Sequence, residues 1–155
     1  MKILTNQNLE VKNLLTVRFR DVQENIDKHL SELVIYAKKH NLIRTGMPIS
    51  TTYEIDTKTG DMDMEFYFPI NKPISNKGNL IYKEKLCLYN CLVIKHRGNP
   101  ENIQNSYDIL NNYILENSLM PISSGFNVTI KEVLNIEDVE NYESDIYISI
   151  NPNIT

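Results

Sequence analysis

Two tyrosines are the first residues of this chain whose types and spacing suggest ligand chemistry. Tyr67 and Tyr147 hold matching places in two similar segments, Asp61–Asn71 (DMDMEFYFPIN) and Ser144–Asn151 (SDIYISIN). Each lies on the less apolar face of a segment that alternates at period 2, which is typical of a half-buried strand. If that face lines a groove, the two rings are the aromatic walls that a small-molecule pocket needs. If it faces solvent, they are ordinary cross-strand tyrosines.

Glu132 is the candidate carboxylate for such a groove. It alternates along one predicted strand face with apolar residues, namely Phe126, Val128, Ile130 and Leu134. A carboxylate on an apolar face is costly to bury unless it is paired. Either the strand end has left the core and Glu132 is solvated, or Glu132 faces a groove and pairs with a cationic ligand. In the second case desolvation raises its pKa, and Glu132→Gln weakens the binding of cations only.

Other chemistries find little support. His29, His40 and His96 have no companions at metal-ligand spacing, and there is no Gly-rich phosphate loop and no Gly-x-Ser-x-Gly elbow. We therefore expect no cofactor, no metal and no enzymatic activity. The net charge of −4 and the lack of a long apolar run argue against nucleic-acid and membrane partners. Cys87 and Cys91 are too far apart along a strand for a disulfide, and we expect a cytoplasmic protein.

The elements around these residues occur twice. Apolar periodicity and capping residues predict the order strand, helix, strand, strand in each half, over 9–19, 21–41, 49–55 and 61–71 and then over 86–96, 99–117, 126–134 and 145–150. Ile70 and Ile150 are 80 positions apart (150 − 70), and the predicted helix caps Asp21 and Asn99 are 78 apart (99 − 21). The sequence thus predicts one α+β domain over 1–155. Two tandem β-α-β-β repeats (8–71 and 86–151), joined by a linker (72–85), would form an antiparallel sheet with two helices and pseudo-twofold symmetry.

Three short motifs resemble the GyrI-like effector-binding superfamily in their order and spacing along the chain. They are Lys95–Gly98 (KHRG) before the second helix, Gly46–Tyr53 (GMPISTTY), and the paired strand ends MEFYFPI and DIYISI. The resemblance implies a ligand groove at the pseudo-twofold axis with a buried Glu that pairs with cationic drugs. The Glu-x-Tyr signature of that groove is absent, because Leu134 stands two positions after Glu132. The same departure counts against the hydrolase activity of a minority of the superfamily.

Two functions follow as hypotheses. The first is a non-enzymatic domain that binds a small, drug-like effector through Tyr53, Glu65, Tyr67, Glu132 and Tyr147. The alternative is a protein-binding adaptor of a bacterial secretion or toxin gene cluster, because the chain is also similar to stand-alone uncharacterised Gram-positive proteins. Its candidate contact surfaces are the acidic stretch Glu137–Glu143 and an exposed sheet edge. The protein is expected to be a monomer or a homodimer.

Overall fold

A computed structural model describes residues 2–133 and 135–153 of the chain. The fold is α+β, and in the described part the paired strands are antiparallel. The chain divides into two compact units, which we call the N-unit (Glu10–Leu86) and the C-unit (Met1–Leu9 with Cys87–Thr155). No helix in the described part is long and apolar enough to cross a membrane.

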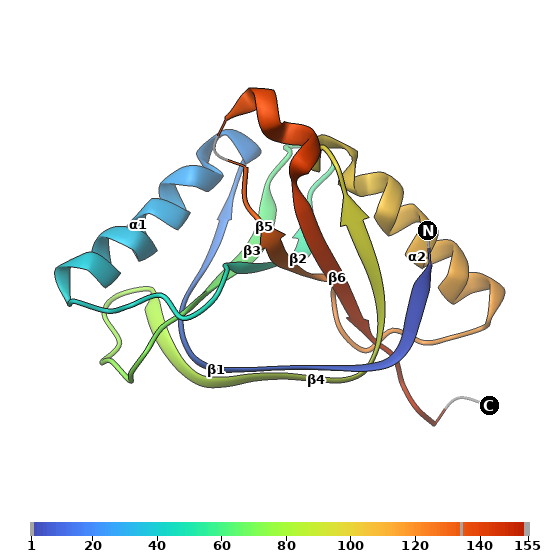
Figure 1. The fold of residues 1–155 in the computed structure, drawn as a ribbon, viewed down its shortest axis with the longest axis horizontal. Helices are drawn as coiled ribbons and strands as arrows, with labels where there is room; N and C mark the ends of the chain where they lie inside the picture. Colours follow the sequence, from blue (N-terminus) through green and yellow to red (C-terminus); the bar gives the residue numbers. More distant parts are fainter. Residues whose placement is uncertain (1, 134, 154–155) are drawn as a thin grey trace. The chain divides into compact units, whose positions relative to one another are not determined.

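The N-unit carries the first repeat. Its elements are β1 (Ile3–Asp21, which starts in the C-unit), the short 3-10 helix η1 (Gln23–Asn25), α1 (Ile26–Lys39), β2 (Ile49–Ile55) and β3 (Met62–Pro69). Strand β3 lies between β1 and β2, with Leu15 opposite Phe68 and Ile49 opposite Tyr67. The helix covers one face of these strands (Figure 1).

The C-unit repeats this plan. Its elements are β4 (Leu80–Arg97, which starts in the N-unit), η2 (Pro100–Asn102), α2 (Ile103–Glu116), β5 (Phe126–Lys131), η3 (Ile136–Asn141) and β6 (Glu143–Ser149). Strand β6 lies between β4 and β5, with Leu92 opposite Ile148 and Phe126 opposite Tyr147. The predicted order of strand, helix, strand, strand in each half is therefore confirmed.

The duplication extends to single hydrogen bonds. Ile70 N donates to Asn13 O at 2.8 Å, and Ile150 N donates to Asn90 O at 3.1 Å. Asn13 and Asn90 both have positive φ, 56° and 54°, a conformation that asparagine tolerates better than most residues. Positions on β1, α1 and β2 thus match positions 77 later (90 − 13), whereas positions on β3 match positions 80 later (150 − 70).

Each unit buries its own apolar core between the helix and one sheet face. In the N-unit, Leu33 and Ala37 of α1 pack on alternate residues of β1 and β3, among them Leu15, Val17 and Phe66. In the C-unit the core consists of Leu92, Ile94, Leu110, Ile114, Ile146, Ile148 and Ile150. Burying one such side chain stabilises the fold by about 1.5–3 kcal/mol. These stripes are the ones that the sequence pattern predicted.

Several boundaries differ from the sequence prediction. Strand β4 begins at Leu80, so the end of the predicted linker is part of a strand. Strand β5 ends at Lys131, and Leu134 lies outside the described residues. The acidic segment expected as a loop contains η3, and α1 begins at Ile26 after η1 rather than at Asp21. Fraying strand ends and short 3-10 turns carry a weak periodic signal, which explains these differences.

Asp21 gives a testable pH dependence at the end of β1. Its carboxylate accepts hydrogen bonds from His29 Nε2 (2.9 Å), Asn25 Nδ2 (2.9 Å) and Val22 N (2.8 Å). These bonds, the one from His29 above all, lower the pKa of Asp21 from 3.8 to about 2. Because the folded pKa is depressed, Asp21 stabilises the native state above pH 3.8, and this contribution is lost as the pH falls toward 2.

We therefore expect Asp21→Asn to lower the free energy of unfolding at pH 6 and to match the wild type near pH 2. Urea unfolding followed by circular dichroism across this range measures the difference. A deficit that stays constant with pH would mean that the carboxylate charge of Asp21 does not stabilise the fold.

Candidate ligand-binding site

Strand β3 is buried on both of its faces toward its C-terminal end. Met64, Phe66 and Phe68 point into the core beneath α1, as their spacing predicted. On the opposite face, Glu65 is only 4% exposed and Tyr67 only 3% exposed. The interpretation of Tyr67 as a solvent-facing tyrosine is therefore wrong. A buried polar face is uncommon in a small domain and points to a site.

Glu65 is held by three donors. Its Oε1 accepts hydrogen bonds from Tyr53 Oη at 2.5 Å and from Tyr67 Oη at 2.7 Å. Its Oε2 accepts one from Lys83 Nζ at 2.7 Å, which also makes an ion pair. We call Tyr53, Glu65, Tyr67 and Lys83 the acidic cluster. All four residues belong to the N-unit. Tyr53, Glu65 and Tyr67 were among the predicted ligand-binding residues, whereas Lys83 was not.

Three different strands bring the acidic cluster together. Glu65 and Tyr67 are two positions apart on β3, so their side chains share one face. Tyr53 lies on β2 where the pairing with β3 shifts between Thr52 and Glu54. Such a bulge re-aims a side chain, and here the Tyr53 hydroxyl lies against Glu65. Lys83 comes from the first part of β4.

The protonation states of the acidic cluster follow from its contacts. Burial alone would raise the pKa of Glu65, but the hydrogen bonds from Lys83, Tyr53 and Tyr67 outweigh it and lower the pKa. Burial, the contact with Tyr53 and the hydrogen bond to Glu65 raise the pKa of Tyr67 well above its ordinary value. Burial and Glu65 likewise raise the pKa of Tyr53. Near pH 7 Glu65 is therefore a carboxylate, and Tyr53 and Tyr67 are neutral phenols.

One side of the acidic cluster reaches the surface. Tyr53 is 40% exposed and the side chain of Lys83 is 39% exposed, whereas that of Glu65 is 5% exposed. The Lys83 ammonium lies 5.1 Å from the centre of the Tyr67 ring. Arg18, held by Asp63 at 2.8 Å, lies 4.3 Å from the centre of the Tyr53 ring. The cluster thus combines a deep carboxylate with aromatic faces that already attract cations.

The C-unit does not repeat the acidic cluster. The positions equivalent to Tyr53, Glu65, Tyr67 and Lys83 carry Ile130, Asp145, Tyr147 and Asn6. Asp145 lies 3.3 Å from Arg97 Nη1, so a guanidinium already partners it. Tyr147 is partly buried, and burial, Asp145 and Cys91 raise its pKa. Tyr147 belongs to the C-unit and lies outside the acidic cluster, so its role in ligand binding stays a prediction.

Glu132 lies just beyond the end of β5, and its side chain is exposed. Of the two alternatives for Glu132, this placement agrees with the exposed strand end. The predicted burial on an apolar strand face does not occur there, because the exposed fraction rises along β5 from Phe126 to Lys131. Glu132 is therefore not part of the acidic cluster.

Comparisons with known proteins give the fold. No protein-family model matches the chain, and no curated protein matches its sequence. The C-terminal domain of EcmrR, solved by crystallography, aligns with a TM-score of 0.75 and 18% identity over 97% of this chain and 99% of that domain. EcmrR in a complex with DNA aligns with a TM-score of 0.79 and 18% identity. The match spans 96% of this chain but only 57% of the EcmrR chain.

Two proteins from Listeria innocua share the fold more distantly. An uncharacterized conserved protein has a TM-score of 0.65 and 8% identity, over 97% of this chain and 91% of its own. A hydrolase has a TM-score of 0.55 and 7% identity, with the same coverage. These likenesses show that the chain shares its fold with these proteins. At such low identity they do not transfer an activity or a ligand.

Proposed function

We propose that this protein is a non-enzymatic small-molecule-binding domain, and that its acidic cluster recognises a cationic group of the ligand. The observation that carries the proposal is the Glu65 carboxylate, which is buried on the face of β3 that does not pack against α1. Two phenols orient it, and the only cation bound to it among the described residues is the half-exposed Lys83.

Cation recognition follows from this chemistry. A carboxylate beside aromatic faces attracts a positive charge through both the ion pair and the ring quadrupoles. Tyr53, which is 40% exposed, also supplies apolar surface for the remainder of an amphipathic cation. The likeness to the C-terminal domain of EcmrR, a protein solved in a complex with DNA, supports a binding role rather than catalysis.

The same residues are less suited to hydrolysis than to cation binding. A general base works best when its pKa lies near the working pH. The pKa of Glu65 is instead lowered by its three donors, and the pKa of Tyr67 is raised, so neither group is tuned to exchange protons near pH 7. The adaptor alternative remains a prediction that rests on the similarity to stand-alone Gram-positive proteins and on the absent Glu-x-Tyr signature, with the acidic stretch Glu137–Glu143 as one candidate contact surface.

The experiment is a thermal-shift screen with matched pairs of amphipathic cations and neutral analogues of the same shape. A ligand that binds the native state alone raises the melting temperature by mass action. At a concentration 100 times its Kd, a cation contributes about 2.7 kcal/mol, which moves the melting temperature by several degrees. We expect cations to shift it and their neutral analogues to do so less.

Salt provides the control for this screen. Because the ion pair with Glu65 forms in a largely buried place, raising the ionic strength should weaken the shift only modestly. A broad panel that produces no shift, or equal shifts from cations and neutral analogues, contradicts the proposed recognition.

A further inference from the structure

The Lys83 side chain shows what kind of cation fits the Glu65 carboxylate. Its ammonium group donates to Glu65 Oε2 at 2.7 Å, which is the length of a charge-assisted hydrogen bond. The same group lies 5.1 Å from the centre of the Tyr67 ring. Lys83 therefore occupies the acidic cluster as the alkylammonium group of a ligand would, and a ligand that displaces it must replace these contacts.

The two oxygens of Glu65 differ in what they can still accept. Oε1 accepts hydrogen bonds from the hydroxyls of Tyr53 at 2.5 Å and Tyr67 at 2.7 Å, and these two donors use both of its lone pairs. Among the described residues, Oε2 accepts a hydrogen bond from Lys83 alone. One N–H group at Oε2 is therefore enough to complete the hydrogen bonding of the carboxylate.

Burial makes this one donor necessary. The side chain of Glu65 is 5% exposed, so water is a poor substitute for a lost partner. A buried acceptor that loses its partner costs more free energy than an ordinary hydrogen bond contributes, and the cost rises when the acceptor is charged. A quaternary ammonium group has no N–H, and its alkyl groups also hold the positive charge farther from Oε2, which weakens the Coulomb attraction.

The aromatic rings offer a quaternary cation little compensation. Such a cation is attracted by the faces of aromatic rings, and Tyr67 is only 3% exposed. One face of Tyr53 is already covered by Arg18, which Asp63 holds through hydrogen bonds of 3.0 and 2.8 Å. The hydrogen bond to Oε2, rather than the contact with the rings, therefore decides which cation binds best.

We infer that the acidic cluster selects an alkylammonium group that carries at least one N–H, and that it discriminates against quaternary ammonium groups. This inference rests on the proposed function and names the class of cation that the cluster recognises. The ligand nitrogen takes the place of Lys83 Nζ beside Glu65 Oε2. Its alkyl chain leaves the cluster on the side where Lys83 and Tyr53 reach the surface.

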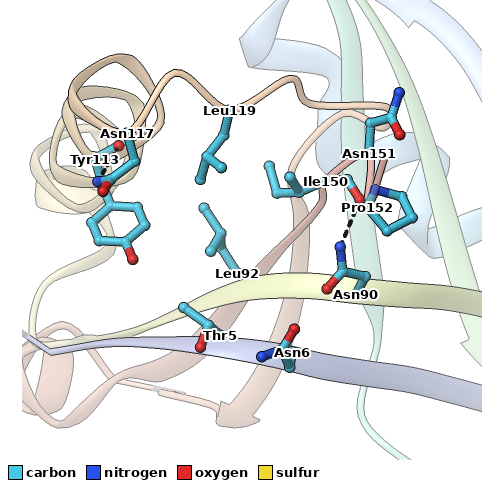
Figure 2. A pocket seen from close by; sticks show the side chains of 10 residues that line it. All are labelled: Thr5, Asn6, Asn90, Leu92, Tyr113, Asn117, Leu119, Ile150, Asn151 and Pro152. Carbon is cyan, nitrogen blue, oxygen red and sulfur yellow. Dashed lines mark hydrogen bonds between the residues drawn. The ribbon is translucent and has the colours of Figure 1, made fainter. Parts of the chain in front are cut away.

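Neither the position that matches Glu65 in the C-unit nor the C-unit pocket shown in Figure 2 offers such an acceptor. Asp145, at the matching position, already lies 3.3 Å from Arg97 Nη1. The pocket is lined by asparagines and by apolar residues such as Leu92, and no described lining residue carries a charge (Figure 2). We therefore expect the ammonium ligand to bind to the N-unit.

The test is a calorimetric titration at pH 7 with hexylamine, its N-methyl, N,N-dimethyl and N,N,N-trimethyl derivatives, and hexanol. The full chain is used as the wild type and as Lys83→Met, in which no internal cation competes. We expect the affinity to change little as far as the dimethyl derivative, which keeps one N–H. It should fall about tenfold or more at the trimethyl derivative, because a hydrogen bond to a charged group is lost.

Glu65→Gln tests the role of Oε2 in this selectivity. The amide oxygen can accept from Tyr53 and Tyr67, but the amide nitrogen then presents N–H groups where Oε2 stood. The preference for the primary over the quaternary cation should therefore disappear in this variant. Glu132→Gln, at an exposed carboxylate outside the cluster, should keep the full preference.

The outcomes separate this inference from the proposed function. Equal affinity for the primary and quaternary cations, or a loss spread evenly over the three methyl groups, overturns the inference but leaves cation recognition by Glu65 intact. Hexanol that binds as tightly as the cations contradicts both. If none of these compounds binds to either protein, the inference is wrong, and the broader thermal-shift panel decides the proposed function separately.

Discussion

Replacing Lys83 by methionine is expected to lower the free energy of unfolding by about 1–3 kcal/mol at pH 7. Removing one partner of a buried ion pair leaves the other charge uncompensated, which costs about 3–5 kcal/mol when both are fully buried. The loss here is smaller because Lys83 is 39% exposed and because Tyr53 and Tyr67 still donate to Glu65. Urea unfolding measures it.

The deficit of Lys83→Met should shrink on acidification. Burial is the largest influence on the pKa of Glu65, and in the wild type it is outweighed by the three hydrogen bonds, with Lys83 first. Without Lys83, burial raises this pKa, so protonation at lower pH relieves the buried charge. Lys85→Met is the matched control: Lys85 pairs with Glu10 at 3.4 Å where both side chains are 45% exposed, and its loss should cost less than about 1 kcal/mol.

The same variant should bind amphipathic cations more tightly than the wild type. Lys83 holds the place beside Glu65 Oε2 that a cationic ligand would take, so the wild type must give up one ion pair to form another. Removing that competitor is expected to improve cation affinity about tenfold or more, which corresponds to 1.4 kcal/mol or more. Lys83→Arg keeps the competitor and should show no gain. Equal affinity in wild type and Lys83→Met would mean that the ligand does not reach Glu65.

The architecture could be predicted from the sequence because its signals are local and repeated. Period-2 alternation located β2 at Ile49–Ile55, and its partner β3 was expected within one or two residues of its observed ends. The similarity of the segments around Ile70 and Ile150 predicted the duplication. In the structure, the backbone N–H groups of these two residues donate equivalent hydrogen bonds to Asn13 O and Asn90 O. Each element is encoded by residues close together in the chain, and the duplication follows from comparing two such local patterns.

The acidic cluster could be predicted only in part, because it depends on contacts between distant segments. Tyr67 and Glu65 were selected for their shared face, but Lys83 was assigned to a linker of Asn, Lys, Gly and Pro. Leu80, Tyr82 and Leu86 fall on one face at period 2, but Glu84 on that face and Ile81 on the other break the alternation, so the signal for an earlier strand start was weak. The bulge that turns Tyr53 toward Glu65 has no comparable signal, since a one-residue shift in pairing is set by the partner strand.

Glu65→Gln is expected to have the largest effect on ligand binding, whereas the same change at Glu132 should have none. Glu65→Gln keeps the size of the side chain and an oxygen that can accept from Tyr53 and Tyr67, but it removes the charge. The carboxylate of Glu65 is deeply buried, where its attraction for a cation is screened less than at the surface. We expect cation affinity to fall about 10–100-fold and the affinity of a neutral analogue to stay within about twofold.

Glu132→Gln is the matched control, because Glu132 is exposed beyond the end of β5 and should change neither affinity. Both substitutions are best measured by calorimetry in the Lys83→Met background as well, where no internal cation competes. There Glu65→Gln should also restore the stability that Lys83→Met lost, since the buried charge is gone and the two changes couple. If Glu132→Gln weakens cation binding and Glu65→Gln does not, the ligand's cation is bound outside the acidic cluster and the proposed site is wrong.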